Sequence, residues 1–495
     1  MRVRDCWNRP STGVPSRTIH LLERESSDYN KKFKLTGHVV EHLNMSSYNY
    51  LGFAQKEGPC ADDAEKTTRA LGIGIGSPRS EVGTMAIHHE VEALVARFMG
   101  TEDSVVVSMG FATNSTTIPA LVQKGCLLIS DELNHASLVF GARLSGADIR
   151  VFPHNDMAGL EKLLRTAISQ GQPRTHRPWK KILVVVEGLY SMEGNACHLR
   201  DLVALKKKYK FYLYVDEAHS VGALGPHGRG VCDYFGVNPR DIDILMGTFT
   251  KSFGAAGGYI AANKVVCDHL RQYNHGSCYS EPMPPVVAQQ TLTSMRIIMG
   301  EDKREDGNIR LQSILENAIA LRNGFQKMGF IVYGWQTMPV IPLLLFNPAK
   351  IAYHLFSRSA ASSLPLSAVR IARFWHERCT HRWPNGHGNT TAHSHANAKQ
   401  EDWRLWWSAT LPPRSLPPAL ASACPPPTPV GTSCAPCKWS VKWATCWVSK
   451  SAANGLPRKH QTWAPLTIFS RSPEIPSQYK NTHRNAEKMV NLIVQ

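Results

Sequence analysis

The stretch LMGTFTKSFGAAGGYIAA, residues 245–262, decides how this chain is interpreted, because it sets one lysine among small side chains. Lys251 lies between an apolar run, Ile242–Met246, and a second short run, Gly258–Ala261. A lysine in this setting either reaches water from a loop or is held in a cavity. In a cavity its amine can be neutral and nucleophilic, as Schiff-base chemistry requires. The stretch alone leaves both interpretations open.

Apolar runs of strand length alternate with helix-like segments through the first 350 residues. Segments such as Met157–Ser169 and Leu202–Tyr209 have helical patterns. Several of the runs are apolar throughout, which is typical of strands buried on both faces. The alternation predicts an α/β domain with a mainly parallel sheet. The expected strands are Ser104–Val107, Cys126–Ser130, Ile149–Phe152, Ile182–Val186, Phe211–Val215, Ile242–Met246 and Gly258–Ala261.

The regions beside this domain are less regular. A long amphipathic helix is expected over 303–328, followed by strands at Phe330–Tyr333 and Val340–Phe346. The pattern predicts four parts: an irregular N-terminal arm over 1–60, a large domain over 61–300, the start of a small domain over 301–352, and a divergent tail over 353–495.

The composition changes near Ala352. Residues 351–495 hold nine of the twelve tryptophans and fifteen prolines, and neither the helical nor the strand period is present there. We therefore expect a disordered or aberrant tail. The same residues carry a net charge of +12, against +5 for residues 1–350, so the basic balance does not indicate a nucleic-acid partner for the first two thirds.

The chain shows no export or membrane pattern. No run of about 18 apolar residues is present, and the first residues lack the apolar core of a signal peptide. Twelve cysteines without a framework spacing indicate free thiols in a reducing compartment.

Polar residues follow four of the expected strands, at the end where α/β sheets bind ligands. In SMGFATNS, residues 108–115, the amides at Gly110 and Phe111 can face a phosphate, and Thr113 or Asn114 can cap the next helix. His135 follows the second run; it is either structural or a flat ring that covers a planar cofactor.

Two further segments complete the set. Asp216 and His219 follow a buried strand, where the carboxylate needs a partner such as a protonated ring nitrogen. A metal pair is the alternative, but no third ligand lies nearby in the sequence, so no metal is expected. Thr248 and Thr250 can add hydroxyls to the same phosphate beside Lys251. A lysine, an aspartate, a histidine and a phosphate cradle are what a protein contributes to pyridoxal 5′-phosphate chemistry.

The segments DELNHAS, EGLYSMEG, YVDEAHSVGALGPHGRG and GTFTKSFGAAGGYIA resemble the α-oxoamine synthases, a fold-type I pyridoxal-phosphate family of the aspartate aminotransferase type. Further stretches, NMSSYNYLGFA and HHEVEALVARFMG among them, resemble the lysine-bearing subunits of the serine palmitoyltransferases within that family. The resemblance covers residues 1–352. It implies condensation of L-serine with a long-chain acyl-CoA such as palmitoyl-CoA to 3-ketosphinganine, the first step of sphingolipid synthesis.

The resemblance also implies roles for individual residues. Lys251 carries the cofactor and handles the α-proton, and His135 stacks on the ring. Asp216 pairs with the ring nitrogen, while His219 and Ser191 lie near the phenolic oxygen. The phosphate is assigned to Gly110, Phe111, Thr248 and Thr250, and the substrate entrance to Asn49 and Tyr50.

The family further implies a heterodimer with a homologous, lysine-less subunit at the cytosolic face of the endoplasmic reticulum membrane. Membrane association would then come through that partner. The family's small domain continues where this chain changes composition, and Arg373 does not match the arginine that anchors the substrate carboxylate there. Three hypotheses stay open: an active subunit, a cofactor-binding but inactive subunit, and an aberrant product without a stable fold.

Overall fold

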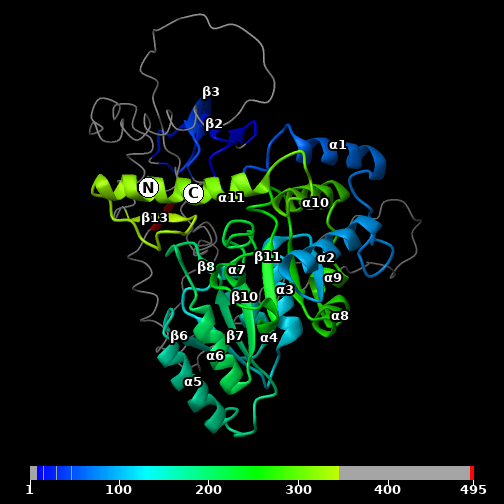
Figure 1. Ribbon diagram of the computed structural model, residues 1–495, viewed down its shortest axis with the longest axis vertical. Coiled ribbons are helices and arrows are strands. Elements are labelled where there is room, and N and C mark those ends of the chain that lie inside the picture. Colours follow the sequence, from blue (N-terminus) through cyan, green and yellow to red (C-terminus); the bar gives the residue numbers. More distant parts are fainter. Residues whose placement is uncertain (1–7, 15, 29, 46, 345–490, 495) are drawn as a thin grey trace, which may run out of the picture. The chain divides into compact units, whose positions relative to one another are not determined.

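The chain is described by a computed structural model over residues 8–14, 16–28, 30–45, 47–344 and 491–494. Its centre is a seven-stranded sheet with the order β4-β12-β11-β10-β7-β5-β6 (Figure 1). Only β12 runs against its neighbours, so the predicted α/β fold with a mainly parallel sheet is confirmed. The strands are β4 (Asp103–Val107), β5 (Leu127–Asp131), β6 (Asp148–Phe152), β7 (Ile182–Glu187), β10 (Tyr212–Asp216), β11 (Ile244–Thr248) and β12 (Gly258–Ala262).

Helices cover both faces of this sheet (Figure 1). Those packed on one face include α2, α5, α6 and α10, and those on the other include α3, α4 and α8. The helices are α1 (Pro59–Leu71), α2 (Ala86–Met99), α3 (Gly110–Leu121), α4 (Ala136–Ser145), α5 (Met157–Gln170), α6 (Leu199–Tyr209), α7 (Val231–Phe235), α8 (Lys264–Tyr273), α9 (His275–Cys278), α10 (Pro285–Ile298) and α11 (Gly307–Lys327).

Strand β7 shows why the apolar runs become central strands. Its side chains alternate between the two cores: Val184 and Val186 pack on one face, and Leu183 and Val185 on the other. All four are at most 1% exposed. Burying a side chain of this size contributes roughly 1.5–3 kcal/mol, so a strand with two buried faces is apolar along the part that packs into both cores.

The prediction of an irregular arm over residues 1–60 is wrong in part. Part of that segment forms a three-stranded antiparallel sheet of β1 (Ser11–Thr12), β2 (Thr18–Glu25) and β3 (Lys34–Leu43). The turn between β2 and β3 is fixed by Asp28, whose Oδ1 accepts the N–H groups of Lys31 at 3.0 Å and Lys32 at 2.8 Å. The sequence signal was weak because β3 exposes residues on both faces.

Beyond residue 300 the predicted helix is confirmed as α11, and the second predicted strand as β13 (Ile341–Leu344). β13 pairs with β14 (Asn491–Val494). The strand predicted at Phe330–Tyr333 is wrong: it holds only a single bridge, Val332 to Leu343. The predictions for residues 345–490, including those about Arg373 and the tail, lie outside the described residues.

A short hairpin of β8 (Leu189–Tyr190) and β9 (Asn195–Ala196) follows β7. Within the described ranges, the chain contains no helix with the length and apolar character needed to span a bilayer.

Candidate active site

The predicted polar residues meet at the carboxyl edge of the sheet. Asp216 is the last residue of β10 and Thr248 the last of β11, and these strands are adjacent and parallel. Lys251 follows β11, and His135 caps helix α4 just after β5. The topology therefore brings these strand ends to the same edge of the sheet.

The turn that carries Lys251 packs against the N-terminal segment 49–54. Gly254 closes the turn, with its N–H donating to the Lys251 carbonyl at 3.1 Å. Its φ is +62°, and a Cβ there would lie 2.6 Å from the Ala54 nitrogen, so only glycine allows this approach. Gln290 of α10 joins the two segments, because its Nε2 lies 3.1 Å from the Phe53 carbonyl and 3.2 Å from that of Phe253.

Lys251 itself is half-buried, with its amine withdrawn from bulk water. Desolvation lowers the pKa of its amine, while the carboxylates of Asp216 and Glu187 act in the opposite direction. Among the described residues, no carboxylate lies within ion-pair distance of its Nζ. Nζ lies 5.7 Å from the centre of the Tyr48 ring. A lowered pKa favours the neutral amine, which is the nucleophilic form.

Asp216 is 3% exposed and is held by two donors. Its Oδ2 accepts Asn114 Nδ2 at 2.7 Å, and its Oδ1 accepts the Ala218 N–H at 2.9 Å. The Tyr214 hydroxyl fixes the amide of Asn114 by donating to its Oδ1 at 2.7 Å. The prediction that Thr113 or Asn114 caps the helix is wrong: both lie inside α3, whose first residue is Gly110.

The ring of His135 lies near this aspartate. Its side chain is exposed, and Nδ1 lies 2.8 Å from Ser137 Oγ. Phe111 meets the ring edge-on, with 6.4 Å between ring centres. Desolvation lowers the pKa of His135, with the charge of Lys251 acting in the same direction and that of Asp216 opposing it.

His219 is buried and joined to the N-terminal segment. Its Nδ1 lies 2.7 Å from the Tyr50 hydroxyl, and the Tyr48 ring stands 5.9 Å from its own. Desolvation, followed by the charge of Lys251, puts the pKa of His219 well below its ordinary value. Asn49 supports the segment itself, because its Oδ1 accepts the Ala54 N–H at 3.2 Å.

The residues predicted to bind phosphate lie close together at the start of α3. Thr248 Oγ1 lies 2.8 Å from Thr250 Oγ1, and a Cβ on Gly110 would lie 2.8 Å from the same Thr248 oxygen. The first N–H groups of α3, from Gly110 and Phe111 onward, have no partner in the helix, and its N-terminus favours an anion.

These residues fit pyridoxal phosphate. A helix N-terminus with two hydroxyls matches a phosphate, the anchored Asp216 matches a ring nitrogen, and the open ring of His135 matches a planar face. Ser191 is half-buried in the turn after β8, and its assignment stays a prediction.

Sequence reasoning missed three contributors. Glu187 ends β7 beside Asp216, Asn114 orients Asp216, and Tyr48 faces both Lys251 and His219. Only the pairing of β7 with β10 brings Glu187 into the site, and no local pattern shows that pairing.

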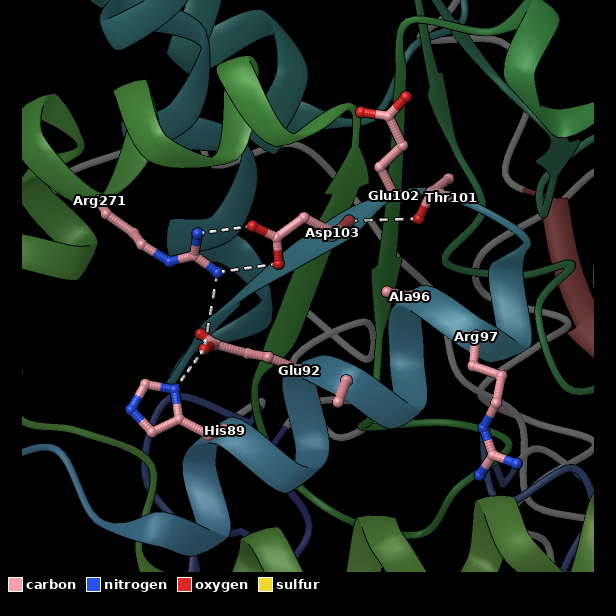
Figure 2. Close-up of a pocket in the computed structure, with 9 residues that line it drawn as sticks. His89, Glu92, Ala96, Arg97, Thr101, Glu102, Asp103 and Arg271 are labelled. Carbon is pink, nitrogen blue, oxygen red and sulfur yellow. Dashed lines mark hydrogen bonds and ion pairs between the residues drawn. The ribbon is translucent and has the colours of Figure 1, made fainter.

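A separate cavity of about 410 Å³ lies between α2, the start of β4, and α8 (Figure 2). Figure 2 shows Arg271 joined to Asp103 and Glu92 across it. Arg79 pairs with Glu92 from the preceding loop. Its cations are thus paired with carboxylates, which indicates a structural ion cluster distinct from the lysine site.

The sheet and the lysine site together define the class of the protein, and comparison with known proteins agrees. Residues 40–372 match the family of class I and II aminotransferases. The chain is 53% identical over 353 residues to human serine palmitoyltransferase 3, covering 71% of this chain and 64% of the relative. It is 50% identical over 358 residues to serine palmitoyltransferase 2 of Dictyostelium discoideum, covering 72% and 73%.

A solved serine palmitoyltransferase from S. paucimobilis, with a bound PLP–myriocin adduct, superposes with a TM-score of 0.60 at 29% identity. The match covers 71% of this chain and 80% of that one. The chain belongs to the serine palmitoyltransferases within the class I and II aminotransferase family. It spans under two thirds of the length of the human relative.

Proposed function

We propose that this chain is the lysine-bearing subunit of a serine palmitoyltransferase. It would bind pyridoxal 5′-phosphate and condense L-serine with palmitoyl-CoA, with loss of carbon dioxide, to give 3-ketosphinganine at the start of sphingolipid synthesis. The observation that carries this proposal is the position of the half-buried Lys251, which follows the end of β11 at Thr248 while Asp216 ends the adjacent parallel strand β10.

Pyridoxal phosphate, when bound, supplies a carbonyl carbon for amines and a ring that accepts electrons from the substrate's α-carbon. Lys251 provides the amine that holds the cofactor and then moves the proton at the α-carbon. Asp216, anchored by Asn114 and Ala218, keeps a proton on the ring nitrogen and so maintains its electron-accepting power.

The remaining residues bind and orient. His135 would cover one face of the ring, and His219, held by Tyr50, would bind the phenolic oxygen together with Ser191. Gly110, Phe111, Thr248 and Thr250 hold the phosphate. Asn49 and Tyr50 line the entrance for serine and the acyl chain, since their segment packs on the lysine turn.

The proposal extends to assembly. The partner would be a homologous, lysine-less subunit, and the complex would work at the cytosolic face of the endoplasmic reticulum membrane. The domain division proposed for the chain places the arm at 1–60 and the cofactor-binding domain at 61–300. The small domain would begin at 301–352, with the tail at 353–495.

The deciding experiment is to co-express the full chain with the lysine-less subunit and purify the complex. The lysine-bound cofactor should absorb in the visible range, the band should shift with L-serine, and borohydride reduction should leave the cofactor on the Lys251 peptide. Addition of palmitoyl-CoA should yield 3-ketosphinganine by mass spectrometry.

The matched control is Lys251→Ala, which should bind the partner but show no reducible adduct. A wild-type adduct on a different lysine would overturn the site. A correct adduct without product would overturn the activity while leaving the cofactor site intact.

A further inference from the structure

A second buried carboxyl group, Glu187, lies at the same edge of the sheet, and the proposed chemistry leaves it without a task. The register of the parallel strands β7 and β10 pairs it directly with Asp216. Glu187 is 6% exposed. The site therefore contains two adjacent carboxyl groups, although a ring nitrogen needs only one.

Glu187 is bonded to the main chain of His135. Its Oε1 accepts the His135 N–H at 2.5 Å. The preceding residue, Asn134, is also bonded to β7, because its Nδ2 donates to the Val185 carbonyl at 2.8 Å. The same Nδ2 donates to Ser130 Oγ of β5 at 2.9 Å. The position of the His135 ring above the site is thus set by β7 through two consecutive residues.

Burial and the neighbouring carboxyl groups disfavour the ionised form of Glu187. Three titratable groups face it: Asp216 from β10 and Glu193 from the turn between β8 and β9, which raise its pKa, and Lys251 from the turn after β11, which opposes them together with the His135 N–H. Burial is the largest cause that raises the pKa of Glu187 well above its ordinary value, and Asp216 is the second. Two buried carboxylates side by side would repel each other, so one of them keeps its proton.

The partners decide which one. Asp216 accepts two N–H donors, from Asn114 and Ala218, and donors of this kind stabilise an anion. Glu187 needs only one acceptor oxygen for the His135 N–H, and a protonated carboxyl retains that oxygen.

We propose that Glu187 is a positioning residue that works as a neutral acid. It holds the main chain of His135 and leaves Asp216 as the single negative charge of the pair. This inference deepens the proposed function and rests on it for its effect on catalysis, but the protonation of Glu187 can be measured without any activity.

The first test is infrared difference spectroscopy on the full-length wild-type chain and on Glu187→Gln, both in complex with the partner subunit and without added cofactor. We expect the C=O stretch of a protonated carboxyl group at neutral pH in the wild type and its loss in the variant. A wild type whose spectrum lacks this band overturns the inference, whether or not the complex proves to be a serine palmitoyltransferase.

The second test compares Glu187→Gln with Glu187→Ala in the cofactor-loaded complex. Glutamine reproduces a neutral acid, so E187Q should keep kcat/KM within about twofold and should keep the pH profile and the visible band. Alanine removes the acceptor for His135, and E187A should lose about 10–100-fold in kcat/KM.

The matched control is Glu132→Gln. This exposed glutamate lies in the loop between β5 and α4, and its substitution should not change these readouts. If E187Q falls more than about tenfold while its unfolding midpoint is unchanged, the negative charge is required and the inference is wrong. This comparison stands even if E187A fails to fold. If the wild type takes up no pyridoxal phosphate, the proposed function fails instead, and the infrared result still decides the state of Glu187.

Discussion

The protein contains two charged clusters, one at each end of the sheet's strands. They differ in whether their cations are paired with carboxylates. At the amino end of β4, Arg271 donates to Asp103 at 2.6 Å, and Arg79 pairs with Glu92. At the carboxyl ends, no carboxylate among the described residues pairs with Lys251, and desolvation lowers the pKa of its amine. Guanidinium groups that are paired with carboxylates stay charged and hold helices and strands together. An amine without a carboxylate partner can instead react as a nucleophile.

The difference also separates stability from chemistry. Glu92 joins the 79–84 loop, α2 and β4, since its Oε1 also accepts the Val106 N–H at 3.1 Å. The residues around Lys251 are instead those that we propose to position the cofactor and the substrate. Changes at the two ends should therefore have separate effects, one on unfolding and the other on the cofactor and turnover.

The largest expected effect is on stability. Glu92→Ala leaves the Arg79 guanidinium without its partner at a site where that side chain is 14% exposed. We expect the free energy of unfolding to fall by about 3–5 kcal/mol, measured by denaturant titration. The control is Glu90→Ala, an exposed residue of the same helix. A loss of under about 1 kcal/mol would mean that water replaces the carboxylate, and the contrast between the clusters would fail.

The next effect is on chemistry alone. Asp216→Asn keeps the shape of the side chain but removes the charge that we propose for pairing with the ring nitrogen of the cofactor. Turnover should fall by about 10²–10³-fold, while the denaturant midpoint should move far less than for Glu92→Ala. Asp62→Asn, at an exposed position on α1, is the control. If Asp216→Asn lowers stability and turnover in the same proportion, the two ends are not separable.

A smaller effect depends on pH. Desolvation raises the pKa of Glu193 to about 7, with the charge of His154 opposing it. The folded chain therefore binds a proton that the unfolded chain releases near pH 4.5, so this group makes stability fall as pH rises from about 4.5 to 7. Glu193→Gln should remove this fall, worth about 2 kcal/mol in denaturant titrations at pH 5 and 8.

The control for this change is Glu132→Gln, an exposed carboxyl group of the same edge. Equal pH slopes for wild type and Glu193→Gln would show that Glu193 is not the group that titrates.

The smallest effect sharpens the lysine end. Tyr50→Phe removes the hydroxyl 2.7 Å from His219 Nδ1. We expect a loss of about 1 kcal/mol, or roughly fivefold in kcat/KM, because a single hydrogen bond orients the ring. Tyr279→Phe, at a residue that is 79% exposed, is the control. A loss of more than about 100-fold would make Tyr50 a group that contacts the reacting atoms.

The sequence predicted most of the sheet because its strands are buried on both faces and leave continuous apolar runs. It also located Lys251, Asp216, His135 and His219, since each follows such a run. The contribution of Glu187 depends on the register of β7 against β10, which pairs residues 29 positions apart. Asn114 was misassigned because a polar residue early in a helix is typical of a cap, whereas here it reaches Asp216 across 102 positions.

The two hydrogen bonds donated by Gln290 have a consequence for the synthesis of the chain. This one amide contacts the carbonyls of Phe53 and Phe253, so this link between the N-terminal segment and the lysine turn forms only after a residue made later than both. On the ribosome, the lysine would already be present while the side chain that closes its surroundings is still untranslated. A nascent chain arrested before α10 should therefore expose Lys251 to amine-reactive labels that the finished protein resists.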